Sequence, residues 1–221
     1  MQPLQRLYDR EGNEVCLFPM KDLYLSTARD PAEHQLLAMD FFGWDNGLRI
    51  NNCPCYAPFS GSVVYTGNDH NMIFWSTNPV RLVDGRLSHL SILVAHSMTA
   101  PPSVGTTIVQ GQQWYYSGNY GQSTGDHLHM EVALGHVTWD SSGTHLQSPE
   151  HMYDVFATND TVISRGMSYN WREYTGGVVP PSGDTKKHHY KFVLMERRRR
   201  SKLYEQRKNI RNYNNYRNYR R

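Results

Sequence analysis

Short hydrophobic runs separated by turn-forming residues dominate residues 34–135 of the chain. Within these runs, apolar residues alternate with polar ones or form blocks of four to six, and Gly, Asn, Asp and Pro stand between them. Long helical periodicity is absent from this region. We expect strands at 61–66, 72–76, 81–83, 91–96, 106–109 and 127–133. The pattern predicts a mostly β fold built on a small antiparallel sheet.

One short helix and a basic tail are expected after the strands. Residues 148–157 match a helix with Ser148 as its N-cap and Pro149 at its first helical position. Glycines at 176–177 and the Pro-Pro-Ser-Gly sequence at 180–183 indicate a linker. We therefore expect an N-terminal lead-in at 1–30, a main domain at 31–158, a linker region at 159–185 and a Tyr/Asn/Arg-rich tail at 186–221.

Charge divides the chain into two unlike parts. Residues 186–221 hold 14 Lys and Arg against two Glu, which is a net charge of +12. Because the whole chain carries +3, the remainder carries −9. A basic tail of this kind favours a polyanionic partner, either an anionic cell-wall polymer or nucleic acid. Packing of the tail on the acidic body or on a neighbouring subunit is the alternative.

Composition excludes several classes of protein. The 221 residues suffice for one domain and a tail, and the three cysteines exclude a disulfide-dense scaffold. The mean hydropathy is −0.67, and the most apolar stretch, 87–98, is interrupted by Ser and His residues, so we expect no membrane span. The first residues lack the apolar core of a signal peptide. The oligomeric state is left open.

Two histidines in the last expected strand carry the strongest chemical signal. His127 and His129 stand at i and i+2, so both side chains face one side of the strand, while Leu128 and Met130 face the other. Such a pair suits one zinc ion, with one imidazole as a ligand and the other beside the metal-bound water. An H-x-H strand can equally present an ordinary polar face, and further ligands are needed to decide.

Four segments together resemble the lysostaphin/LytM-type zinc metallopeptidases, which cut peptide cross-links of bacterial cell walls. His34 followed by Asp40 resembles the first ligand pair of the family, 56–63 resembles its A-P-x-x-G-x-V entry into the sheet, and His96 resembles the histidine of its Y-x-H segment. Residues 121–131, GQSTGDHLHME, resemble its most specific element, G-x-S-T-G-x-H-L-H-F-E. The resemblance covers about residues 34–135.

The resemblance implies a role for each matching residue. His34, Asp40 and His129 would hold Zn²⁺, His127 would act as general base or proton shuttle, and His96 would orient the water or stabilise the developing oxyanion. This chain departs from the pattern in three ways. Six positions separate His34 from Asp40, which makes Asp45 a rival ligand. Val94 replaces the usual Tyr before His96, and Asp126 stands where Pro or a small residue is common.

Other residues near these motifs have two interpretations. Glu131 shares a face with the histidine pair and is either a hydrogen-bond partner of a ligand or a solvated carboxylate. His89 is the rival of His96, which has the better distance to the following hairpin. The remaining histidines are expected to be structural or solvated; they are His70, His136, His145, His151, His188 and His189.

The sequence therefore predicts a zinc-dependent endopeptidase with the metal on the floor of a groove in the sheet. The expected substrate is the peptide cross-links of peptidoglycan. The absence of a signal sequence and the basic tail favour a phage lysin or tail-associated protein, in the virion or released onto the cell wall. The alternatives are an inactive family member that serves as a structural or wall-binding module, and a nucleic-acid-binding protein that acts through the tail.

Overall fold

The computed structural model describes residues 1–28, 37–45, 47–141, 143–163 and 171–177. The chain divides into two compact units, Met1–Val179 and Pro180–Arg221. The second unit, with the expected basic tail 186–221, lies outside the described residues. No helix in the described ranges is both long and apolar enough to cross a membrane.

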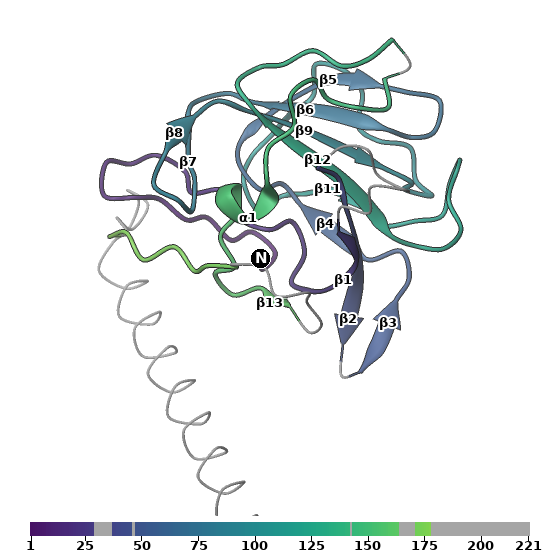
Figure 1. Ribbon diagram of the computed structural model, residues 1–221, viewed down its shortest axis with the longest axis horizontal. Coiled ribbons are helices and arrows are strands. Elements are labelled where there is room, and N and C mark those ends of the chain that lie inside the picture. Colours follow the sequence, from purple (N-terminus) through teal and green to yellow (C-terminus); the bar gives the residue numbers. More distant parts are fainter. Residues whose placement is uncertain (29–36, 46, 142, 164–170, 178–221) are drawn as a thin grey trace, which may run out of the picture. The chain divides into compact units, whose positions relative to one another are not determined.

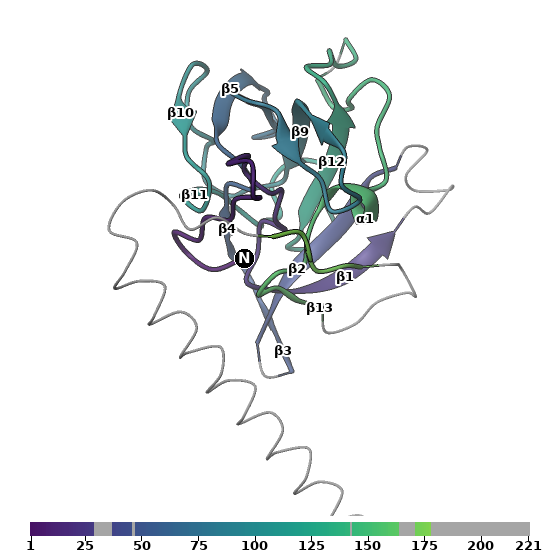
Figure 2. The same ribbon diagram turned by 90° about the vertical axis from the view of Figure 1, so that its left-hand side faces the viewer.

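Strands make up most of the regular structure (Figure 1, Figure 2). Nine strands form one sheet in the order β10-β5-β6-β9-β12-β2-β1-β13, with β3 paired to β2, and two further pairs are β4 with β11 and β7 with β8. The pairing of β1 with β13 is parallel. The elements are β1 (Asp22–Ala28), β2 (Met39–Asp45), β3 (Leu48–Ile50), β4 (Pro54–Tyr56), β5 (Gly61–Thr66), β6 (Met72–Ser76), β7 (Val80–Arg81), β8 (Leu87–Ser88), β9 (Leu90–Ala95), β10 (Thr107–Ile108), β11 (Gln113–Tyr116), β12 (Leu128–Leu134), α1 (Met152–Val155) and β13 (Val162–Ile163).

The mostly β prediction is confirmed, and the sheet is mixed rather than purely antiparallel. β5 and β6 have the predicted bounds, while β9 and β12 begin and end within one residue of the expected positions. The helix is shorter than expected. It begins after His151, and Ser148 adopts a positive φ of 53°, so Ser148 is not its N-cap.

Residues 1–28 are part of the folded unit, although the sequence led us to expect a lead-in at 1–30. β1 lies here, and Val15, Cys16, Leu17 and Phe18 are fully buried. The polar turn at 9–13 hides this short apolar segment when the sequence alone is examined. Part of the region expected as a linker also belongs to the folded unit. It supplies β13 and Trp171, whose side chain packs against the core.

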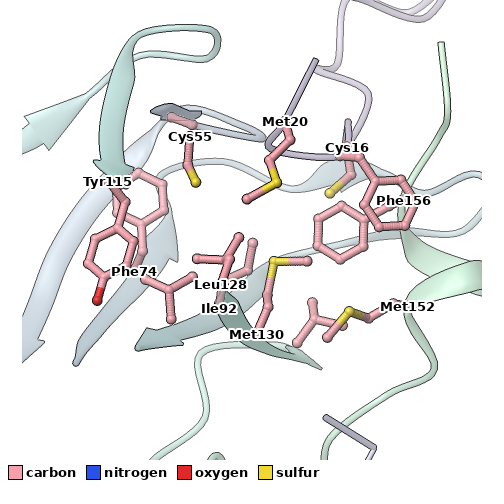
Figure 3. Close-up of a cluster of buried hydrophobic side chains, with 14 of the residues drawn as sticks. Cys16, Met20, Cys55, Phe74, Ile92, Tyr115, Leu128, Met130, Met152 and Phe156 are labelled. Carbon is pink, nitrogen blue, oxygen red and sulfur yellow. The ribbon is translucent and has the colours of Figure 1, made fainter. Parts of the chain in front are cut away.

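The main hydrophobic core lies on one face of the sheet (Figure 3). Leu128, Met130 and Val132 alternate along β12 and point into it. The N-terminal segment and α1 cover this face. Labelled members of the cluster are Cys16, Met20, Cys55, Phe74, Ile92, Tyr115, Leu128, Met130, Met152 and Phe156.

The opposite face of β12 carries the predicted site. His129 and Glu131 alternate with the core residues, and Ala133, next in the same row, packs with Leu93 and Leu146 in a second buried cluster. The segment around Leu146 thus covers part of this face. His129 and Glu131 therefore lie on the side of the sheet that faces away from the main core.

Replacing Phe74 by alanine should lower the free energy of unfolding by about 3–5 kcal/mol, the usual cost of emptying a buried phenylalanine site. Phe74 is fully buried, stacks on Phe59 at 5.5 Å between ring centroids and meets Trp114 edge-on at 4.8 Å. Urea denaturation followed by circular dichroism measures the change. Leu4→Ala, at a side chain 79% exposed, is the control and should change stability by less than about 0.5 kcal/mol. An equally small effect of Phe74→Ala would contradict this description of the core.

Candidate metal centre and catalytic histidines

The register of two neighbouring strands brings Asp40 and His129 together. β2 and β12 are antiparallel, and Asp40 is paired with His129, so both side chains point to the same face. Asp40 Oδ1 lies 3.1 Å from His129 Nδ1. Two ligands of a tetrahedral zinc with bonds of about 2.0–2.1 Å are about 3.3 Å apart. The observed spacing therefore fits two ligands of one zinc ion. His34, the expected third ligand, lies outside the described residues.

His127 stands just before β12, beside this pair. Its backbone exchanges two hydrogen bonds with Gly118, which fixes the chain where it enters the strand. Its Nδ1 lies 2.7 Å from the carbonyl oxygen of Gly125. A carbonyl oxygen can only accept, so Nδ1 carries the hydrogen and Nε2 of the neutral ring carries a lone pair. Nε2 lies 3.6 Å from Asp40 Oδ1 and is placed to accept a proton beside the Asp40–His129 pair.

His96 lies on the other side of His127. It follows β9 with a φ of 79°, a region that residues other than glycine seldom adopt. Two hydrogen bonds with Tyr120 hold it there: the Tyr120 N–H donates to the His96 carbonyl at 3.0 Å, and His96 Nδ1 donates to the Tyr120 carbonyl at 3.0 Å. The His96 ring centroid lies 4.7 Å from that of His127 and 5.8 Å from that of His129. Burial lowers the pKa of His96, which keeps its ring neutral near pH 7.

Gly118 allows the segment 117–126 to lie close to His96. A Cβ atom at Gly118 would lie 2.2 Å from the carbonyl oxygen of His96. Any larger residue would push the segment 117–126 away from the histidines. The carbonyls that accept from the His96 and His127 rings both come from this segment, so its position sets the orientation of the two rings.

A second cluster lies on the other nitrogen of His129. Glu131 is fully buried, and its Oε1 lies 3.6 Å from His129 Nε2 and 2.7 Å from His145 Nδ1. Its Oε2 accepts the Leu146 N–H at 2.7 Å. Burial raises the pKa of Glu131, but hydrogen bonds from His129, His145 and Leu146 outweigh burial and lower it. Glu131 is therefore ionised and buried, with its charge compensated by these donors.

The ligand atoms of His129, Glu131 and His145 lie within 4.8 Å of one another and could also hold a metal ion. The two carboxylates differ in their partners and in their own exposure. Both oxygens of Glu131, whose side chain is 0% exposed, are engaged by His145 Nδ1 and the Leu146 N–H, although the His145 side chain itself is 45% exposed. The side chains of Asp40 and His127 are 13% and 15% exposed. A catalytic zinc needs one position open to water or substrate. The Nδ1 side of His129 fits that requirement, and Glu131 fits the role of a carboxylate that orients a metal-ligating histidine.

The sequence left Asp45 as an alternative to Asp40, and His89 as an alternative to His96; the structure shows where each residue lies. Asp45 is exposed at the far end of β2, whereas Asp40 faces His129. His89 lies before β9, near Ser76 and His136, whereas His96 contacts the site. His145, which we expected to be structural or solvated, contacts Glu131. No local motif indicates this, because 14 positions separate the two residues and a loop brings them together.

Comparison with known proteins finds a phage protein that is similar to most of the chain. The chain is 29% identical over 188 residues to "Morphogenesis protein 1" of Bacillus phage B103, covering 79% of this chain and 49% of that protein. The chain thus spans about half the length of this relative. No family model matches the chain.

Solved structures of peptidases match parts of the chain. The catalytic domain of lysostaphin from Staphylococcus simulans matches with a TM-score of 0.37 and 20% identity, over 60% of this chain and 84% of that one. A zinc-containing peptidase from Vibrio cholerae matches with a TM-score of 0.38 and 18% identity, over 58% of this chain and 40% of that one. The chemistry of the site is inferred below from its own residues.

The metal-free protein should lose a stabilising contribution as the pH rises from about 6.5 to about 9. Burial alone lowers the pKa of His129, but hydrogen bonds with Asp40 and Glu131 outweigh burial and raise it to about 9. The folded state then binds this proton more tightly than the unfolded chain, so the contribution is complete below about pH 6.5 and is lost as the pH passes through about 9. Its size is about 3–4 kcal/mol at most, from about 1.4 kcal/mol per pKa unit. Melting temperatures of chelator-treated protein across this pH range measure it.

The matched control is the same titration on His129→Gln. Taking the difference between the two proteins removes other titrating groups, such as the buried Met1 amine, whose pKa burial lowers to about 5. If the two proteins show parallel pH profiles, His129 does not hold an extra proton in the folded state.

Proposed function

We propose that the protein is a zinc-dependent endopeptidase that hydrolyses peptide cross-links of bacterial peptidoglycan. The observation that carries the proposal is the 3.1 Å spacing of Asp40 Oδ1 and His129 Nδ1, on paired strands and beside two more histidines. The G-x-S-T-G-x-H-L-H sequence motif supports the same chemistry. The residues that would hold zinc are His34, Asp40 and His129.

The bound zinc would polarise the scissile carbonyl and lower the pKa of a water molecule towards neutrality. His127 would take a proton from that water at Nε2 and return it to the departing amine, because its Nδ1–H is held by the Gly125 carbonyl. His96 donates from Nδ1 to the Tyr120 carbonyl, so its neutral ring can only accept at Nε2. This favours a role for His96 in orienting the water over a role in donating to the oxyanion.

The phage relative supports a proposal for the setting of the reaction. Because that relative is a phage protein named for morphogenesis, we propose that this protein belongs to a virion and acts on the bacterial cell wall. The binding of anionic wall polymer or nucleic acid by residues 186–221 stays a prediction.

Two single substitutions should separate the metal ligand from the proton carrier. His129→Ala should lose both zinc and cleavage activity. His127→Ala should keep most of its zinc and lose turnover by about 10²–10⁴-fold, the usual contribution of a general base. Zinc content is measured by atomic emission, and cleavage is measured on purified peptidoglycan and on a soluble cross-linked peptide.

His151→Ala is the control for loss of a histidine, because His151 lies beside α1 and contacts Tyr153. It should leave zinc and turnover unchanged. Full zinc content in His129→Ala would overturn the ligand assignment. Stoichiometric zinc and wall binding without cleavage in the unmodified protein would instead identify a wall-binding module.

Glu131→Gln should weaken zinc binding by about 10–100-fold, the usual effect of altering a partner that orients a metal-ligating histidine. The substitution keeps the size of the side chain and removes the charge that faces His129 Nε2. Competition with a chromogenic chelator measures the affinity. Glu150→Gln removes a carboxylate paired with Arg86, on the protein surface, and serves as the control. Equal affinities in the two variants would show that Glu131 has no part in metal binding.

A further inference from the structure

Arg49 is held in a fixed position at the edge of the site. It lies on β3, where it is paired with Trp44 of β2. Its guanidinium carbon lies 4.2 Å from the centroid of the Phe42 ring, a cation–π contact. Its Nη2 donates a hydrogen bond to the carbonyl oxygen of Asp126. An exposed arginine would ordinarily sample many rotamers, and these two contacts restrict this one.

Among the described residues, Arg49 shares with Arg6 and Arg10 the lack of a carboxylate partner, whereas three other arginines have one. Arg81, Arg86 and Arg172 each contact at least one carboxylate within 3.0 Å. In the parts of the chain that the structure describes, no carboxylate lies within ion-pair distance of Arg49. The neighbouring carboxylate of Asp126 is engaged elsewhere: it accepts the Asn52 N–H at 2.8 Å and the Ser117 hydroxyl at 2.5 Å.

Arg49 also lies close to the reacting groups. The Asp126 carbonyl that it contacts belongs to the residue before His127, and its Nη2 would lie 3.5 Å from a Cβ atom at Gly125. Phe42, which it covers, stands two positions after Asp40 on the same face of β2. Two residues along a strand span about 6.6 Å. An extended peptide advances about 3.3–3.6 Å per residue, so a group one or two residues from the scissile bond can reach the guanidinium.

We propose that Arg49 binds a free carboxylate of the peptide substrate, one or two residues from the bond that is cut. A guanidinium presents planar paired N–H donors that match a carboxylate, and the contacts with Phe42 and Asp126 orient it before the substrate arrives. The ligand class is a peptide that carries a free carboxylate, from a side chain or a chain end. This inference rests on the proposed peptidase function and adds a determinant of specificity to it.

The test compares two synthetic cross-linked peptides that differ only in this group, one with the free carboxylate and one with a carboxamide. The unmodified zinc-loaded protein should cleave the carboxylate peptide with a kcat/KM about tenfold or more above that of the carboxamide, as expected for a hydrogen bond to a charged group. Arg49→Gln should reduce this ratio to about one. Arg49→Lys, which keeps the charge but loses the paired donors, should give an intermediate ratio.

Arg86→Gln is the matched control, because it removes one exposed arginine that already pairs with Asp84 and Glu150. It should keep the unmodified ratio. Equal cleavage of the two peptides by the unmodified protein, or an unchanged ratio in Arg49→Gln, would overturn the inference while leaving the peptidase intact. Equal slowing of the cleavage of both peptides in Arg49→Gln would also overturn it. That result would show only that Arg49 holds the Asp126 carbonyl in position.

Cleavage of neither peptide would count against the proposed function and not against Arg49. In that event, equilibrium binding of the same two peptides, labelled with a fluorophore, decides the question. Tighter binding of the carboxylate peptide that disappears in Arg49→Gln supports the inference, and equal binding of both peptides overturns it.

Discussion

The pairing of β2 with β12 is the constraint on which the site depends. Side chains alternate between the faces of a strand, so a slip of one residue would turn Asp40 into the core and bring Met39 to the site. Burial prevents this slip, because Met39 and Phe41 on β2 face the same core as Leu128 and Met130 on β12. The hydrophobic side of the sheet thus determines which polar atoms meet on the other side, and the 3.1 Å spacing of Asp40 and His129 follows from it.

Backbone carbonyl groups complete the site. The carbonyls of Tyr120 and Gly125 each accept a hydrogen bond from one imidazole, so a single segment, 117–126, fixes the tautomers of both His96 and His127. Asp126 attaches this segment to Asn52 and Ser117. The departure from the family pattern at position 126 therefore has a structural reason: the aspartate anchors the loop that positions the histidines.

The sequence predicts the parts of the molecule that local patterns specify. Alternation and flanking turn residues locate β5 and β6, and the i, i+2 spacing of His127 and His129 identifies the central strand of the site. Patterns of this kind cannot reveal contacts made across long stretches of chain. His145 reaches Glu131 over 14 positions, and Arg49 reaches Asp126 over 77, through loops whose course is set by tertiary packing.

Two local interpretations were wrong for similar reasons. The first 30 residues look polar, yet the short apolar segment around Cys16 and Phe18 packs into the core because the sheet and α1 surround it. Ser148 and Pro149 resemble a helix start, but Pro149 makes an isolated bridge with Ala133, and the chain turns into α1 only at Met152. In both cases tertiary contacts outweighed local preference.

The attachment of Glu131 to His145 and Leu146 has a consequence for protein engineering. Surface loops beside an active site are the usual targets when the specificity of an enzyme is redesigned, because they tolerate changes of length and composition. Residues 143–147 are an exception, since this segment supplies two of the donors that compensate the buried Glu131 charge beside His129. A combinatorial library built here would change the partners of Glu131 and so the setting of His129, which is the proposed zinc ligand. Its variants should therefore be ranked after saturation with zinc.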